Sequence, residues 1–116
     1  MTTRSSATST PPPLTGKQRR HLRALAHPLK PVVQVGHAGL TAPVLSAIDG
    51  ALETHELIKV RVAGEAPETD EIARRIEART NSVVAQIIGK TLIVYRRRKK
   101  DPTISLPKAS KAAQGD

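Results

Sequence analysis

The chain has 116 residues, with no Cys, Phe or Trp and a single Tyr, and its nineteen Lys and Arg outnumber ten Asp and Glu to give a formal net charge of +9. The lack of cysteine excludes disulfides, thiolate nucleophiles and cysteine-ligated zinc. No apolar stretch approaches the ~20 residues of a membrane span, so we expect no membrane partner. The lack of Cys suits a reducing cytosol, and residues 1–13 lack the apolar core of a secretory signal, so we expect a cytoplasmic protein. The basic balance favours a polyanionic partner over a charge that only keeps the protein soluble.

The two ends of the chain differ from the middle in composition. Residues 1–13 are mostly Ser, Thr and Pro, with too little apolar surface to offset the entropy of ordering, so we predict a disordered N-terminal segment. Residues 14–100 are expected to form one small domain with a core of Val, Ile, Leu and Ala. Residues 101–116 are expected to form a flexible C-terminal tail.

The first predicted helix follows Thr15. The spacing of Thr15 and Gln18 is that of a capping box, in which the hydroxyl and the amide side chain satisfy backbone groups reciprocally. We expect the buried stripe to consist of Leu22, Leu25 and Ala26. Pro28 and Pro31 then end the helix.

A short strand, a glycine turn and a second helix come next. The β-branched run 32–35 predicts a strand, and Gly36-His37-Ala38-Gly39 predicts a turn. Thr41 is placed to cap a helix that tolerates Pro43 in its first turn. Its predicted apolar face contains Val44, Leu45, Ile48 and Leu52.

The second half of the chain predicts two more strands, a helix and a closing hairpin. Residues 57–62 alternate, with Lys59 and Arg61 on the outer face of a half-exposed strand. A third helix, capped by Glu68 or Thr69, buries Ile72, Ala73 and Ile76. Gly89-Lys90 joins the last two strands, 83–88 and 91–95, in a tight turn. The order αβαβαββ predicts an α/β fold, an α+β sandwich of helices on a four-stranded mixed sheet.

Charge is unevenly distributed along the chain. No acid precedes Asp49, and none occurs between Ala78 and Lys100, whereas both stretches are rich in Lys and Arg. Most acids therefore lie in the middle of the sequence. This segregation is expected if one side of the molecule meets phosphate groups.

Two features could bind nucleic acid. The first is the turn Gly36-His37-Ala38-Gly39, whose glycines let the backbone approach a phosphate and which leads into a helix N-terminus with unpaired amides, as in the GxxG loop of KH domains. The alternative is that this segment is an ordinary turn between a strand and a helix. The run Arg96-Arg97-Arg98-Lys99-Lys100 follows a rigid strand and is either a solvated tail or a second phosphate-binding path. The candidate RNA-binding residues are Gly36, His37, Ala38, Gly39, Lys17, Arg19, Arg20, Arg23, Lys30, Arg96, Arg97 and Arg98.

Other chemistries find little support. The spacings of His21, His27, His37 and His55 match no metal site, and no hydrolase, phosphate-loop, zinc-protease or dinucleotide motif is present, so we expect no metal, cofactor or enzymatic activity. Tyr95 is the only Phe, Tyr or Trp residue, which excludes the aromatic base-stacking used by several RNA-binding folds. Recognition of phosphates and of RNA shape remains.

Several stretches, taken together and in order, resemble the CRM domain (chloroplast RNA splicing and ribosome maturation), in particular its stand-alone bacterial YhbY-like form. They are Leu14-Thr15-Gly16-Lys17-Gln18-Arg19, residues 25–36, Gly39-Leu40-Thr41, residues 55–60, residues 88–92 and Ile104-Ser105-Leu106-Pro107. The resemblance covers roughly residues 14–108.

The resemblance implies a fold similar to the C-terminal domain of bacterial translation initiation factor three. It also implies RNA binding through the GxxG loop and its basic surroundings, and a role in assembling the large ribosomal subunit. We therefore expect a monomeric RNA-binding protein whose partner is large-subunit ribosomal RNA or its precursor particles. The alternative is a general, charge-driven nucleic-acid binder.

Overall fold

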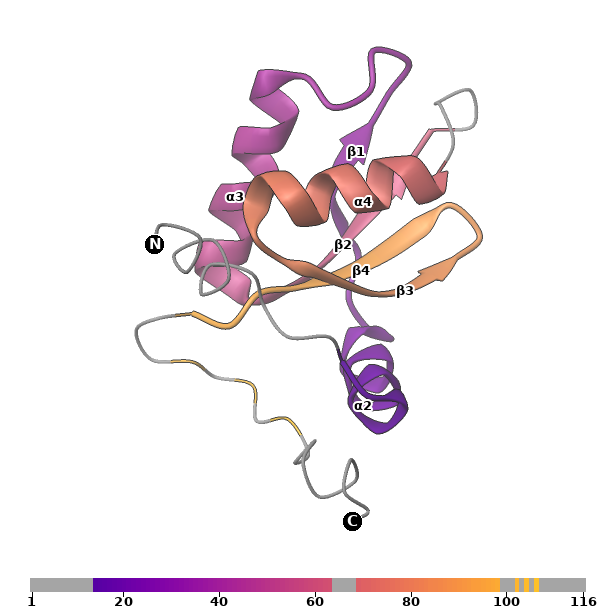
Figure 1. Ribbon diagram of the computed structural model, residues 1–116, viewed down its shortest axis with the longest axis vertical. Coiled ribbons are helices and arrows are strands. Elements are labelled where there is room, and N and C mark those ends of the chain that lie inside the picture. Colours follow the sequence, from indigo (N-terminus) through magenta and orange to yellow (C-terminus); the bar gives the residue numbers. More distant parts are fainter. Residues whose placement is uncertain (1–13, 64–68, 99–101, 103, 105, 107–116) are drawn as a thin grey trace, which may run out of the picture.

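The computed structural model describes residues 14–63, 69–98, 102, 104 and 106, which form three helices and four strands (Figure 1). Helix α2 (Gly16–Ala26) begins with the predicted capping box: Thr15 Oγ1 accepts from the Gln18 amide at 3.1 Å, and the Thr15 amide donates to Gln18 Oε1 at 3.1 Å. Helix α3 (Ala42–His55) is capped by Thr41, as predicted. Helix α4 (Thr69–Thr80) carries two acids in its first turn, where their negative charges interact favourably with the positive end of the helix dipole. The loop 64–68, including the cap predicted at Glu68, lies outside the described residues.

The four strands form one mixed sheet in the order β1-β2-β4-β3. Strand β1 (Pro31–Val35) runs parallel to β2 (Leu57–Val62), while β4 (Thr91–Tyr95) is antiparallel to both β2 and β3 (Val83–Ile88). Gly89 has a φ of 61°, which fits the predicted tight turn between β3 and β4. The predicted element order and four-stranded mixed sheet are confirmed.

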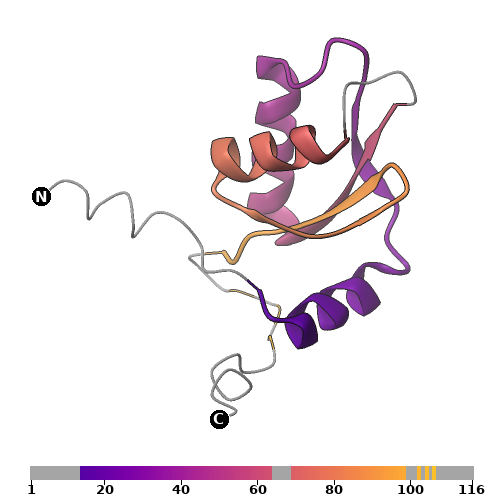
Figure 2. The ribbon, with the colours of Figure 1, turned by 45° about the vertical axis from the view of Figure 1, so that its right-hand side comes forward.

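The sheet is covered differently on its two faces. Helices α3 and α4 pack on one face, over a core that includes Ile58, Val60 and Val62 of β2. Helix α2 packs on the opposite face, where Leu57 joins Ile93 and Tyr95 in a second cluster. Figure 2 shows the pair of helices and α2 on either side of the strands. The alternation of residues 57–62 therefore separates the two cores, as the sequence predicts for a strand.

The buried stripe of α2 differs from the predicted one. Leu22 and Ala26 are fully buried, but Leu25 is 41% exposed and Gln18 is buried instead. The buried positions are each four residues apart, so they form one narrow line along the helix. Leu25 lies beside that line and faces a surface pocket.

Two described residues of the C-terminal segment pack against the domain. Ile104 and Leu106 contact the cluster beneath α2, and the Ile104 amide donates to Glu56 Oε1 at 2.9 Å. The packed part of the chain thus extends past residue 100, where sequence analysis placed the start of a flexible tail. Ile104 and Leu106 are apolar, and both become partly buried against this cluster.

Glu56 is the buried anchor of this segment. It is fully buried and has a φ of 65°, a conformation that L side chains rarely adopt. Its amide donates to Leu52 O, and its carbonyl accepts from the Arg96 amide. The carboxylate accepts from the amides of Arg98 and Ile104, both at 2.9 Å. The pKa of the neighbouring Tyr95 is raised above its ordinary value, mainly by burial and to a lesser extent by the charge of Glu56. Arg97 acts on this pKa in the opposite direction.

Candidate nucleic-acid interface

The GxxG loop links the end of β1 to the start of α3 at one end of the molecule (Figure 1). The Gly39 amide donates to Gly36 O at 2.9 Å, and Gly39 has a φ of +75°, so the second glycine is required by the backbone. His37 and Ala38 are exposed at the tip. A Cβ added at Gly36 would meet no atom within 4 Å, so the space beside this glycine is open.

The helix behind the loop has few free backbone amides to offer a phosphate. Thr41 Oγ1 accepts from the Val44 amide at 3.4 Å, and Pro43 has no N–H to donate. The expected set of unpaired amides at the N-terminus of α3 is therefore reduced. A phosphate placed at this end would meet the loop backbone, the positive end of the helix dipole and nearby side-chain cations.

Acidic residues are confined to one side of the described structure. Helix α2 and all four strands, each described over its full length, contain no Asp or Glu. The acids of the described elements lie on α3 and α4, and Glu56 directly follows α3; the exposed or partly exposed ones are Asp49, Glu53, Asp70, Glu71 and Glu77. We call the opposite side, formed by α2 and the sheet surface around it, the acid-free face. An RNA strand lying on this face would meet no carboxylate of those five elements.

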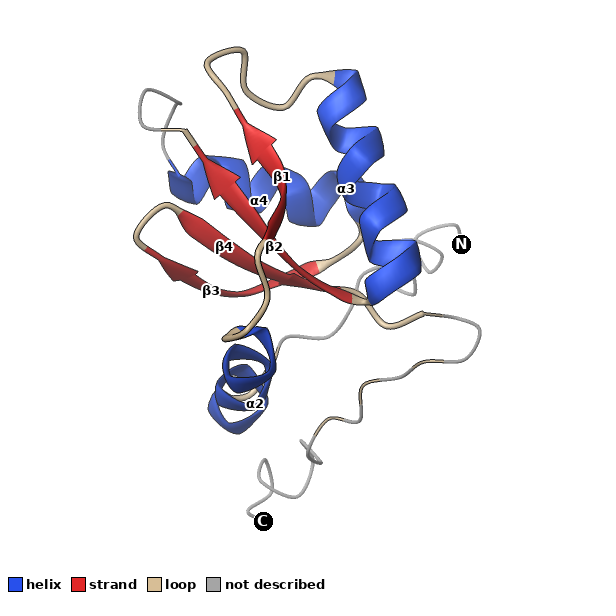
Figure 3. Cartoon of the chain, turned by 180° about the vertical axis from the view of Figure 1, so that it is seen from behind, coloured by secondary structure: helices blue, strands red, loops and turns tan. Residues whose placement is uncertain are grey.

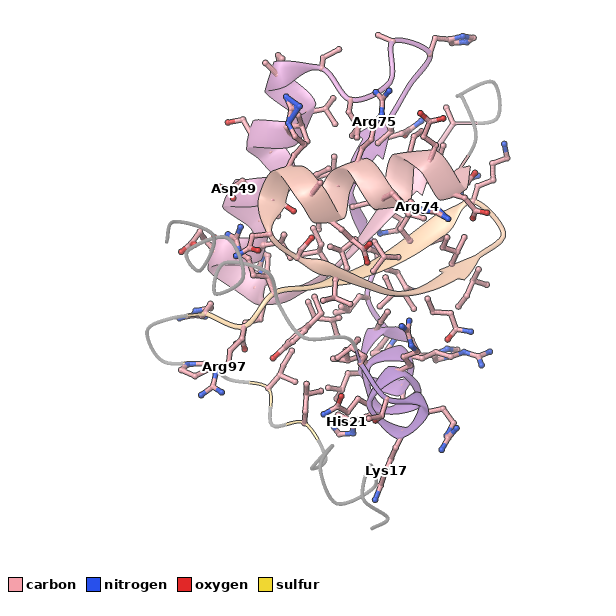
Figure 4. All side chains as sticks on the ribbon, viewed as in Figure 1. Lys17, His21, Asp49, Arg74, Arg75 and Arg97 are labelled. Carbon is pink, nitrogen blue, oxygen red and sulfur yellow. The ribbon has the colours of Figure 1, made fainter. Side chains whose placement is uncertain are left out.

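Cations are spread along the acid-free face. Lys17, Arg20 and Arg23 are exposed on α2, which lies at the end of the sheet away from the GxxG loop (Figure 3). Figure 4 shows Lys17 at this far end. The predicted loop and helix sites are therefore not adjacent.

Strand β2 bridges the two ends. Lys59 and Arg61 point to the α2 side of the sheet, since they alternate with the core residues beneath α3. Arg61 is exposed and lies opposite Gln34, two residues before the GxxG loop. Lys59 Nζ donates to His27 O at 3.4 Å, next to α2. The sequence predicts that Lys59 and Arg61 lie on the outer face of this strand, but neither is among the candidate RNA-binding residues predicted from the sequence.

Arg19 has a structural role. Its Nη1 donates to Ala85 O at 2.8 Å and to Val84 O at 3.4 Å. The register of β3 against β4 shifts at this point, between Val84 and Gln86. Such a bulge disrupts the ladder locally, and Arg19 satisfies its carbonyl groups. The Arg19 guanidinium is therefore engaged within the protein.

Arg96 is also engaged within the protein. Its side chain, 16% exposed, lies 2.7 Å from Asp49 Oδ1 and 3.0 Å from Glu53 Oε2, and it donates to Thr80 O at 2.7 Å. Arg97 is exposed (Figure 4). Arg98 uses its amide to bind the Glu56 carboxylate and its Nη1 to bind Thr54 O. The arginine run is thus neither a uniform tail nor a uniform binding path, and Arg97 is its most accessible described member.

The described residues suggest no metal centre or membrane segment. No three His, Cys, Asp or Glu side chains in this part of the chain come together in a way that could hold a metal ion. Among the same residues, no helix has the length and apolar character needed to cross a membrane.

Comparison with known proteins identifies the family. Residues 14–96 match the model of the CRS1 / YhbY (CRM) domain. The chain belongs to the CRM family. An RNA-binding protein of Haemophilus influenzae is 45% identical over 96 residues, which is 82% of this chain and 96% of the relative. The probable RNA-binding protein YqeI of Bacillus subtilis is 40% identical over 95 residues, covering 81% of this chain and 99% of the relative.

A solved structure supports the same assignment. The solution structure of a hypothetical protein from Staphylococcus aureus, described as a candidate RNA-binding protein, is 40% identical and superposes with a TM-score of 0.72. It covers 82% of this chain, and all of that protein is matched. The predicted resemblance to stand-alone CRM proteins is therefore confirmed. In this CRM domain the packed segment continues past the family match, because Ile104 and Leu106 contact the second core cluster.

Proposed function

We propose that this CRM domain is a non-catalytic RNA-binding protein that holds structured RNA by its phosphates, through the GxxG loop and the acid-free face. The observation that carries the proposal is the confinement of described surface acids to α3 and α4. Most protein contacts to nucleic-acid backbones come from cations and backbone amides, and a surface free of carboxylates avoids like-charge repulsion with phosphate. The RNA-binding relatives agree with this function.

The proposed contact surface has three parts and one further cation. The loop, Gly36 to Gly39, receives the phosphates of one part of the RNA. Arg61 and Lys59 continue the path along β2, and Lys17, Arg20, Arg23 and Lys30 receive phosphates around α2. Arg97 adds a cation at the end of β4. The only Phe, Tyr or Trp residue, Tyr95, is buried, so stacking on such residues does not contribute.

The proposed target is large-subunit ribosomal RNA within precursor particles, bound by a cytoplasmic monomer during assembly. This finer part of the proposal comes from the resemblance to stand-alone CRM proteins. Sedimentation of the tagged protein through a gradient of cell lysate tests it. Co-migration with large-subunit precursors supports it, whereas co-migration with all nucleic acids alike would favour the charge-driven binder.

A pair of glycine substitutions tests the loop. Gly36→Asp places a carboxylate where an added Cβ meets no atom within 4 Å, so the fold should tolerate it. Gly50→Asp is the matched control, because an added Cβ on this exposed α3 glycine also meets no atom within 4 Å. Affinity for an RNA hairpin is measured for both at several salt concentrations.

We expect Gly36→Asp to weaken RNA binding by about tenfold or more, and Gly50→Asp to change it little, because one carboxylate enters the phosphate path and the other joins the acidic side. Equal effects would remove the loop from the account. A duplex DNA of equal length, bound as tightly as the RNA at every salt concentration, would favour the general binder.

A further inference from the structure

A surface pocket lies where α2, β1 and the end of α3 meet. It has a volume of about 430 Å³ and is lined by Leu25, Leu29, Lys30, Val32, His55, Leu57, Ile58 and Ile104. Three of these aliphatic side chains are well exposed: Val32 is 53%, Leu25 41% and Leu29 38% exposed. Clefts of this size commonly hold small organic groups, and clustered exposed apolar side chains mark binding surfaces.

The charges around the pocket are positive. Lys30 lines it, and Lys59 Nζ lies 3.4 Å from His27 O, in the connection that forms one wall. No lining residue is acidic. The nearby Glu56 is fully buried, and its carboxylate accepts from the amides of Arg98 and Ile104. The complementary ligand is therefore an apolar, flat or compact group attached to an anion.

From this complementarity we infer that the pocket receives an unstacked nucleobase of the RNA, while the phosphate beside that base lies against Lys30. A nucleotide combines a π face with a charged backbone, and unpaired bases are the parts of RNA that proteins can take out of a stack. His55 supplies an aromatic ring among the lining residues, and the aliphatic side chains supply dispersion contacts. The inference rests on the proposed function and adds a base-binding site to it.

The same RNA strand can reach both the pocket and the GxxG loop. Val32 lines the pocket, and Gly36 begins the loop at the other end of β1. They are four positions apart along the chain, which is about 13 Å at the usual rise per residue. An extended single strand running along this edge of the sheet could place phosphates on the loop and a base in the pocket.

The experiment compares three RNA probes with the full chain. One is a blunt hairpin, the second has a short single-stranded adenosine tail, and the third has a tail of abasic nucleotides that keeps the phosphates and lacks the bases. We expect the adenosine tail to bind about tenfold more tightly than the abasic tail, which is within the range measured for single-base contacts. The variant Leu29→Gln with Val32→Gln should lose this preference and keep its affinity for the blunt hairpin.

Ile88→Gln is the matched control. Ile88 is 44% exposed and lies on β3, outside the pocket, so its replacement removes exposed apolar surface elsewhere and leaves charge unchanged. It should keep the preference for the adenosine tail. Because all three substituted side chains are already exposed, the variants should fold, and circular dichroism checks this.

Equal binding of adenosine and abasic tails by the wild-type protein, with hairpin binding intact, would overturn the base pocket and leave the proposed function standing. A pocket that takes an apolar protein side chain instead would give that result. Failure of the wild-type protein to bind any of the three RNAs would overturn the proposed function, and the inference with it.

Discussion

Replacement of Glu56 by Gln should destabilise the domain strongly for a single-atom change. The Glu56 carboxylate is fully buried and accepts the Arg98 amide on one oxygen and the Ile104 amide on the other, both at 2.9 Å. A glutamine can accept only one of these amides well. Its NH₂ group must then face the second N–H, so two donors meet where a charge-assisted bond existed.

The magnitude follows from the lost bond. A hydrogen bond to a charged group contributes about 1.5–3 kcal/mol, and an unsatisfied buried donor costs about 1–3 kcal/mol. We expect Glu56→Gln to lower the free energy of unfolding by about 2–3 kcal/mol. Glu56 also has a φ of 65°, and such strained residues, at about 1–3 kcal/mol each, persist only where surrounding contacts impose them. Loss of the carboxylate contacts therefore removes part of what holds the backbone there.

Urea unfolding followed by circular dichroism measures the change, and hydrogen exchange at the amides of Arg98 and Ile104 locates it. Both amides should exchange faster in Glu56→Gln. Glu71→Gln is the control, because this carboxylate is 58% exposed and its described ion pair, with Arg75 at i,i+4 spacing, is worth about 0.3–0.5 kcal/mol. A Glu56→Gln protein within about 0.5 kcal/mol of the wild type, with unchanged exchange, would refute the reasoning.

Three further predictions concern charge. Ala38→Lys should tighten RNA binding and steepen the slope of log affinity against log salt by about 0.7–0.9. The control Ala47→Lys, at an exposed position on α3, should do neither. Equal slopes for the two variants would contradict a phosphate contact at the loop. Arg96→Ala should lower the free energy of unfolding by about 1–2 kcal/mol, because the ion pairs and hydrogen bonds of Arg96 hold α3 to the end of β4. Arg97→Ala should change stability by less than about 0.5 kcal/mol and weaken RNA binding. Urea unfolding and RNA titration separate the two effects, and a larger loss of stability in Arg97→Ala than in Arg96→Ala would be inconsistent with the structure. Burial raises the pKa of Tyr95 above 10.0, so the folded state holds this proton more tightly than the unfolded state, and stability falls as pH rises above about 10. In urea titrations at increasing pH, Tyr95→Phe should lose less stability above this pH than the wild type. The same loss of stability in both proteins would assign it to other groups.

Local signals in the sequence were sufficient for most of the fold. The Thr15 capping box, the alternation of residues 57–62 and the Gly89-Lys90 turn each depend on neighbouring residues, and the structure confirms all three. The position of the GxxG loop between a strand and a helix follows from the same kind of signal.

The roles of individual charged residues depend on distant contacts, and sequence reasoning did not find them. Arg19 binds carbonyls at a bulge in β3, 65 and 66 residues away, and nothing local distinguishes it from Arg20. Arg96 is the first member of a basic run, but its position at the end of β4 places it against Asp49. In the sequence, Glu56 is an ordinary acid near a helix end, and only the folded structure shows that its carboxylate accepts the amides of Arg98 and Ile104.

The surface pocket could not be predicted for the same reason. Its lining comes from four separate parts of the chain: α2 and its connection to β1, the start of β1, the junction of α3 with β2, and Ile104. Leu25 was expected in the core because its spacing fits a helical stripe. The narrow contact of α2 with the sheet leaves it at the surface instead.

Backbone amide chemical shifts, followed while an RNA hairpin is added to the full chain, locate the RNA-binding surface residue by residue. We expect the largest changes at Gly36 to Gly39, at Arg61 and along the exposed side of α2, with little change on the outer surfaces of α3 and α4. Changes concentrated on α3 and α4, where the acids lie, would contradict an RNA-binding surface on the acid-free face.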